Sequence, residues 1–419
     1  MPKKIILIVL LVLVVVFVGG IIFFEIEPKN TNVNYDPADS QKVTDTTIRF
    51  NSEGKLKILH IADTHLNYDK HFDASIWVIG EACDVEKPDL VVLTGDNTHP
   101  HDDPEETKKL INSLMNIFES RNIPVAVTFG NHDAEKGPMT RSDIMEYYKT
   151  FSCVISADDT ENFKNCATFN IPVFASDSDN VNFNLWVFDS GDYDEDEPRH
   201  YDRVRTEQIE WYKKTSARLK EENGGEKVNS VVFQHIIVPE IYDVLKKVDS
   251  KQPYAIKHIY NEDEFYMFDP EEVNYGTLNE KPCPGYYNDG QFEALTETGD
   301  VLALFTGHDH TNAFGVRNQN IDIYTSPMTR YKGLAYTTQY GYRVIEIDEN
   351  DTSTYETRVE RLYDVFDFDY IKTAKDNGDK YSTRIAFELA VKGSVQEIYL
   401  KLYKSVIELF TGRQVSYPD

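Results

Sequence analysis

The chain has 419 residues, a net charge of −28 and 41% hydrophobic residues. This length is enough for one large α/β domain or two smaller ones, either of which can bury a substantial core. The acidic charge argues against a general nucleic-acid-binding protein, because such a protein needs a basic surface to neutralise phosphates. The acidity otherwise indicates a well-solvated surface.

The first 24 residues stand apart because an apolar run from Ile5 to Phe24 follows Lys3 and Lys4. About 20 helical residues span roughly 30 Å, the hydrocarbon thickness of a bilayer. We therefore expect residues 1–24 to form a transmembrane helix with a cytosolic N-terminus, which leaves the rest of the chain lumenal or extracellular. A cleaved signal peptide and secretion are the alternative, although the apolar part of a signal is usually shorter.

Residues 25–42 contain several Asn and Pro and few large apolar groups, which predicts a stalk before a domain at residues 43–419. Four cysteines lie in the part expected to be exported, where disulfides can form: Cys83, Cys153, Cys166 and Cys283. A bridge between Cys153 and Cys166 would close a short loop, but four cysteines allow three pairings. Asn350 begins an N-glycosylation sequon, which is consistent with export.

Residues 47–50, a turn and the strand at 55–62 suggest a hairpin that enters a sheet. Strands then alternate with segments of helical spacing at 76–83, 110–118 and 207–219, which predicts an α/β core. Residues 251–299 are polar and weakly periodic, and we expect them to be an insertion near the mouth of the site. Residues 321–324 and 342–347 predict further strands of a second sheet, and residues 394–410 a packed terminal helix.

Five polar motifs follow five of the predicted strands: residues 63–65, 95–97, 130–133, 234–235 and 307–310. In open α/β sheets, ligands bind beyond the carboxyl ends of the strands, so these motifs are expected to meet. They supply carboxylates, an amide oxygen and imidazoles, which suit hard and borderline cations without any thiolate. The candidate metal ligands are Asp63, His65, Asp96, Asn131, His235, His308 and His310.

Each residue also has a simpler interpretation. A lone histidine at a strand end is usually a hydrogen-bonded surface group. Helix capping would explain Asp63 and Asp96, but not the histidine and asparagine beside them. Four other histidines are interpreted as bystanders, and two of them, His99 and His101, are close enough to border the site: His60, His99, His101 and His258.

The five motifs, in this order, resemble those of the calcineurin-like metallophosphoesterase superfamily over residues 45–350. Residues 56–65, and residues 234–235 followed by Pro239 and Glu240, are similar to the purple-acid-phosphatase-related branch of plants and fungi. The resemblance implies a β-sandwich flanked by helices on both outer sides, in four αββα layers. Purple acid phosphatases have a tyrosine three positions after the bridging aspartate, whereas this chain has His99, so a coloured ferric site is not expected.

The resemblance also implies roles for individual residues. Asp63, His65 and His310 would hold one metal, while Asn131, His235 and His308 would hold the other. Asp96 would bridge the two ions, and His132 matches the catalytic histidine of the family. Asp133 either orients His132 or caps a helix. The two ions are expected to be Mn, Fe or Zn, since the ligand types suit all three.

These residues predict a metal-dependent phosphomonoesterase that acts on a phosphoprotein or a small phosphate ester. Two cations about 3.5–4 Å apart would acidify a shared water, and the resulting bridging hydroxide would attack phosphorus in line. His132 would protonate the leaving group. The alternatives are a phosphodiesterase of nucleotides or lipids and, in a different class, a non-catalytic protein-binding scaffold. Oligomeric state is not indicated by the sequence.

Overall fold

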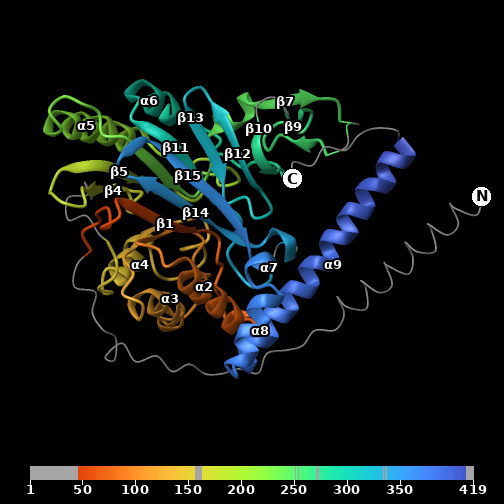
Figure 1. The fold of residues 1–419 in the computed structure, drawn as a ribbon. Coiled ribbons are helices and arrows are strands. Elements are labelled where there is room, and N and C mark those ends of the chain that lie inside the picture. Colours follow the sequence, from red (N-terminus) through yellow and green to blue (C-terminus); the bar gives the residue numbers. More distant parts are fainter. Residues whose placement is uncertain are drawn as a thin grey trace, which may run out of the picture.

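Two large β-sheets form the centre of the molecule in a computed structural model (Figure 1). The structure describes residues 46–155, 163–250, 252, 254–269, 273–333, 335 and 337–411. The predicted anchor at residues 1–24 and the stalk at residues 25–42 lie outside them. Among the helices of the described residues, none is long and apolar enough to cross a membrane.

The first sheet has five strands, and its first three strands in chain order are parallel neighbours. Its order is β15 (Asp351–Arg361), β14 (Gly341–Asp348), β1 (Lys55–Ile61), β2 (Leu90–Thr94) and β3 (Val125–Thr128). The strands β2 and β3 are buried along their whole length, as expected for strands covered on both faces. Because β1, β2 and β3 run parallel, their carboxyl ends lie at the same end of the sheet, before three of the five polar motifs.

The second sheet has seven strands and brings the other two motif-bearing strands side by side. Its order is β10 (Val273–Thr277), β12 (Ala313–Asn318), β13 (Ile321–Thr325), β11 (Val301–Thr306), β6 (Ser230–Gln234), β5 (Val181–Val187) and β4 (Phe169–Phe174). A small third sheet contains β7 (Leu245–Val248), β9 (Phe265–Phe268) and β8 (Ile256–Lys257). The segment expected to be an insertion thus contributes to both of these sheets.

Helices cover both outer faces (Figure 1). On the first sheet, Leu59 and Leu93 pack with Ile79 of α2 (Phe72–Glu86) and Leu114 of α3 (Pro104–Glu119). On the second sheet, the packing helices are α5 (Thr206–Glu222) and α6 (Gln291–Thr298). Between the sheets lies a separate apolar core that includes Ile58, Val92, Val231 and Phe305. These three cores make the four layers that the resemblance implied.

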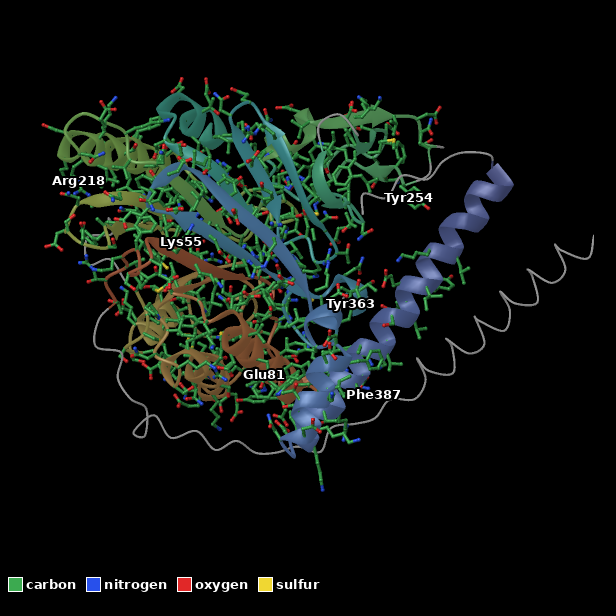
Figure 2. All side chains as sticks on the ribbon, viewed as in Figure 1. Lys55, Glu81, Arg218, Tyr254, Tyr363 and Phe387 are labelled. Atoms are coloured by element: carbon green, nitrogen blue, oxygen red, sulfur yellow. The ribbon has the colours of Figure 1, made fainter. Side chains whose placement is uncertain are left out.

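The remaining helices are short except for the last one. They are α4 (Arg141–Tyr148), α7 (Leu362–Val365), α8 (Phe368–Asp376), α9 (Lys380–Thr411) and the 3₁₀ turns η2 (Pro239–Asp243) and η3 (Thr337–Gln339). The terminal helix begins earlier than predicted, and its packed part comes first, since Ile385 and Leu389 are buried. Phe387 on the same helix is 51% exposed (Figure 2) and Ile398 is 55% exposed. The prediction of a packed helix at residues 394–410 is thus wrong at Ile398.

Three further expectations differ from the structure. Residues 48–50 do not pair with β1, because the backbone N–H of Phe50 donates to Phe174 in the second sheet. The segment at residues 342–347 belongs to the first sheet, as β14, and only the segment at residues 321–324 lies in the second. All four cysteines are free thiols, so the bridge between Cys153 and Cys166 is not formed.

Candidate metal centre

The seven predicted ligands converge where the carboxyl ends of β1, β2, β3, β6 and β11 meet. One group of ligand atoms that all lie within 4.8 Å of one another comes from Asp63, His65, Asp96 and His310. A second such group comes from Asp96, His235 and His308. Asn131 joins the second group, because its Oδ1 lies 3.3 Å from His235 Nε2. The two groups match the two ligand sets that the resemblance implied.

In the first group, imidazole nitrogens face a carboxylate and one another. His65 Nε2 lies 2.9 Å from His310 Nε2 and 3.8 Å from Asp63 Oδ1. His310 Nε2 lies 3.6 Å from the same oxygen of Asp63. Asp63 and His65 are fully buried. Such a buried set of oxygen and nitrogen donors, aimed at one point, has the chemistry of a cation site.

Asp96 lies between the two groups. Its Oδ2 is 3.4 Å from His65 Nε2 of the first group and 3.4 Å from His235 Nε2 of the second. This buried oxygen has no hydrogen-bond partner in the described part of the chain, and an unpaired buried polar atom is costly unless a ligand satisfies it. A cation on each side of Asp96 would satisfy it, so the residues fit a pair of metal ions.

Burial shifts the pKa values of several candidate ligands. It raises the pKa of Asp63 to about 8, and it lowers the pKa values of His65 and His308 well below their usual value and that of His310 to about 4. Neutral imidazoles are the form that binds metals. Burial thus keeps three of the histidines in the neutral form that can bind a metal. It also disfavours ionisation of the Asp63 carboxyl group unless a positive charge lies beside it.

The backbone of the site adopts an unusual conformation. Asp63, His65, Asp96 and His308 have φ values of 55°, 42°, 51° and 71°, the left-handed region that is uncommon for non-glycine residues. Such strain is concentrated at functional sites and persists only where the surroundings enforce it. The glycines of the motifs allow close packing: a Cβ on Gly130 would lie 2.1 Å from Asp96 Oδ1.

Asp133 clamps two of the motif loops together. Its carboxylate accepts hydrogen bonds from the backbone N–H groups of Asp96 (2.7 Å), Asn97 (2.9 Å), Thr98 (3.2 Å) and Gly130 (2.8 Å). Both of its oxygens are occupied by these bonds. The structure therefore corrects the interpretation of Asp133 as a residue that orients His132 or caps a helix.

Glu135 takes the orienting position instead. Its Oε2 lies 2.6 Å from His132 Nδ1, and the backbone N–H of His132 donates to Asp96 Oδ1 at 2.8 Å. The His132 side chain is 29% exposed, so it lies at the open side of the centre. Glu135 lies three residues after His132 and two residues beyond the motif at 130–133, and this spacing alone does not distinguish it from Asp133 as the partner of His132.

Three more residues border the centre. His99 Nε2 lies 3.0 Å from His65 Nδ1, which makes it a support for a ligand. The hydroxyl of Tyr193 accepts a hydrogen bond from Asn131 Nδ2 at 3.1 Å, and the ring of Tyr201 lies 4.4 Å from that of His308. Nothing in the sequence pattern relates the two tyrosines to the motifs. Neither Asp63 nor Asp96 caps a helix, since the N-caps of α2 and α3 are His71 and Asp103.

Several known proteins are similar to this chain. Probable inactive purple acid phosphatase 29 of Arabidopsis thaliana is 28% identical over 309 residues, which cover 66% of this chain and 72% of that protein. Phosphatase DCR2 of Saccharomyces cerevisiae is 26% identical over 294 residues, 64% of this chain and 46% of that protein. Among solved structures, a dimetal phosphatase from Danio rerio aligns with a TM-score of 0.45 at 12% identity, over 69% of this chain and 92% of that one.

The profile described as "Calcineurin-like phosphoesterase" matches residues 56–312, a span that includes every predicted ligand. The Arabidopsis relative agrees with the purple-acid-phosphatase-related branch expected from residues 56–65. The chain belongs to the calcineurin-like phosphoesterase family.

Proposed function

We propose that the chain is a metal-dependent phosphomonoesterase. The observation that supports this most strongly is the position of Asp96 Oδ2, 3.4 Å from an imidazole of each ligand group. Asp63, His65 and His310 would hold one ion, and Asn131, His235 and His308 the other. Two bound cations supply charge neutralisation for the phosphate oxygens and acidify the attacking water.

The protein's own contribution to the reaction centres on His132. Glu135 holds Nδ1, so Nε2 is the ring atom that can pass a proton to the leaving oxygen of the ester. The bond from the His132 backbone to Asp96 Oδ1 fixes the ring relative to the ligands. A proton donor in such a position typically contributes about 10²–10⁴-fold to the rate.

The names of the relatives guide the choice of substrate. Both are called phosphatases, which favours a monoester over the diester of a nucleotide or lipid. The test compares p-nitrophenyl phosphate with bis-p-nitrophenyl phosphate in the presence of Mn²⁺, Fe²⁺ or Zn²⁺. We expect turnover of the monoester that Asp96→Asn abolishes. Preferential turnover of the diester would reassign the chain as a phosphodiesterase.

A non-catalytic protein is the second candidate, because the name of the Arabidopsis relative includes the word "inactive". This chain retains all seven candidate ligands together with His132, which favours catalysis. The metal content of the purified protein separates the two: about two equivalents support the enzyme, and none would support a scaffold that binds other proteins.

The proposal also places the domain at residues 43–419 outside the cytosol, anchored by residues 1–24. The apolar run between Ile5 and Phe24 supports it. In sealed membrane vesicles, the domain should resist added protease until detergent opens the vesicle. A full-length chain recovered from the soluble fraction would contradict the anchor, and a shortened soluble chain would indicate cleavage.

A further inference from the structure

The loop between β5 and α5 is a short hairpin that forms part of the wall of the centre. The backbone N–H of Asp194 donates to His200 at 2.9 Å, and that of Asp202 donates to Asp192 at 3.1 Å. Arg203 anchors the hairpin through an ion pair of 3.0 Å with Asp194. The hairpin is therefore fixed by hydrogen bonds along its length and by a charge at its base.

Two rings of this hairpin face the second ligand group. Tyr193 and Tyr201 stack at 5.6 Å with an angle of 24° between the rings, and the two residues form an isolated β-bridge. Tyr201 in turn meets the ring of His308 edge-on, at 4.4 Å and 86°. Because each aromatic contact fixes the next, the position of Tyr193 is tied to that of a candidate ligand.

The hydroxyl of Tyr193 lies beside the centre with its proton available. The oxygen accepts from Asn131 Nδ2 at 3.1 Å, while Asn131 Oδ1 faces His235. Within the described residues, the hydroxyl proton has no acceptor.

We propose that the Tyr193 hydroxyl donates a hydrogen bond to a phosphoryl oxygen of the bound ester. The inference rests on the proposed function, because it needs a phosphate between the ligand groups and His132. The phenol hydroxyl is both a hydrogen-bond donor and an acceptor, so it can accept from Asn131 and donate to the substrate at the same time. A phosphate oxygen is an anionic acceptor, and bonds to charged groups are stronger than those between neutral groups.

The matched variant is Tyr193→Phe, which keeps the ring stack on Tyr201 and removes only the hydroxyl. The control is Tyr287→Phe, because the Tyr287 side chain is 42% exposed and its hydroxyl makes no hydrogen bond in the described part of the protein. For both variants we would measure kcat/KM for p-nitrophenyl phosphate, calorimetric affinity for inorganic phosphate in the Mn²⁺-loaded protein, and bound metal per chain.

We expect Tyr193→Phe to lower kcat/KM by about tenfold to a hundredfold and to weaken phosphate binding by about tenfold. Metal content should stay at the wild-type value, and Tyr287→Phe should behave as wild type. Unchanged phosphate affinity would overturn the proposal, and so would loss of bound metal, since the hydroxyl would then support a ligand rather than the substrate.

The phosphate titration also distinguishes a failure of the proposed function from a failure of the proposal about Tyr193. If the wild-type chain hydrolyses no ester, the proposed function fails. Phosphate binding to the metal-loaded chain would still decide the role of Tyr193, because it requires no turnover.

Discussion

His132 Nδ1 lies 2.6 Å from Glu135 Oε2, and the two residues belong to one loop. Partial burial would raise the pKa of Glu135, but the hydrogen bond with His132 and the charge of Lys136 outweigh it, so that pKa lies below its usual value. Glu135 is thus ionised at neutral pH. An ionised carboxylate at Nδ1 fixes the orientation of the imidazole and reserves Nε2 for the reaction.

Replacing Glu135 by Gln should therefore impair proton donation without disturbing the metals. We expect kcat to fall by roughly 10–100-fold, with a larger loss for an alkyl phosphate than for p-nitrophenyl phosphate, whose leaving group needs no proton. Metal content should be unchanged. Glu146→Gln on the exposed face of α4 is the control. An equal loss for both esters would contradict a role through His132.

Asp133 should behave as a structural residue. Its carboxylate accepts four backbone N–H groups, and Asn would turn an NH₂ group towards some of them. Because this site is buried, we expect Asp133→Asn to reduce the free energy of unfolding by about 3 kcal/mol, measured by urea denaturation. Asp143→Asn, in the exposed capping box of α4, should cost about 1 kcal/mol or less.

A loss of activity without a loss of stability would indicate that Asp133 takes part in the reaction. If Asp133→Asn were as stable as Asp143→Asn but inactive, the clamp would not explain its place in the motif.

The ligands could be predicted from the sequence because each one follows a strand. The carboxyl ends of neighbouring strands meet in space, so residues that follow those strands are brought together. Asp63 and His310 are far apart in the chain, yet their strands end at the same edge of the sandwich. The alternation of strands and helices predicted an α/β core, whereas the four layers were implied only by the resemblance to the calcineurin-like family.

Features that depend on long-range pairing could not be predicted. A local hairpin was the prediction for Phe50, but this residue pairs with Phe174. The packing of the second sheet determines that pairing. The approach of Tyr193 to Asn131 depends on how the hairpin folds back over the sheet, and composition gives no sign of this. Whether Asp133 or Glu135 contacts His132 depends on the directions of their side chains, and the spacing of the residues in the sequence does not determine those directions.

Removal of metal should destabilise the folded chain. Cations bound at the two groups would stabilise the native state, because a ligand present at 100 times its Kd adds about 2.7 kcal/mol of stability. We expect a chelator to lower the Tm of the wild-type protein in differential scanning calorimetry, and Mn²⁺ or Zn²⁺ to restore it. Asp96→Asn should show a much smaller response, because it removes the charge shared by both groups. An equal response in both proteins would indicate that the cations bind elsewhere.

A buried histidine outside the metal centre should make the stability depend on pH. His60 is fully buried, with Nε2 2.8 Å from Thr94 Oγ1 and Nδ1 2.9 Å from Ser326 Oγ. Burial, assisted by the charge of Arg343, lowers its pKa well below 6.5. Below pH 6.5 the unfolded chain therefore binds a proton that the folded chain does not, and the stability present above this pH is lost as the pH falls.

The His60→Gln variant, which stays neutral, should lack this contribution. Its free energy of unfolding should fall less steeply than that of the wild type between pH 6.5 and about 5, by up to about 1.4 kcal/mol per pH unit. The other titrating groups are common to both proteins, so the difference between the two curves isolates His60. Parallel curves in chemical denaturation across this range would show that the folded protein also accommodates a proton at His60.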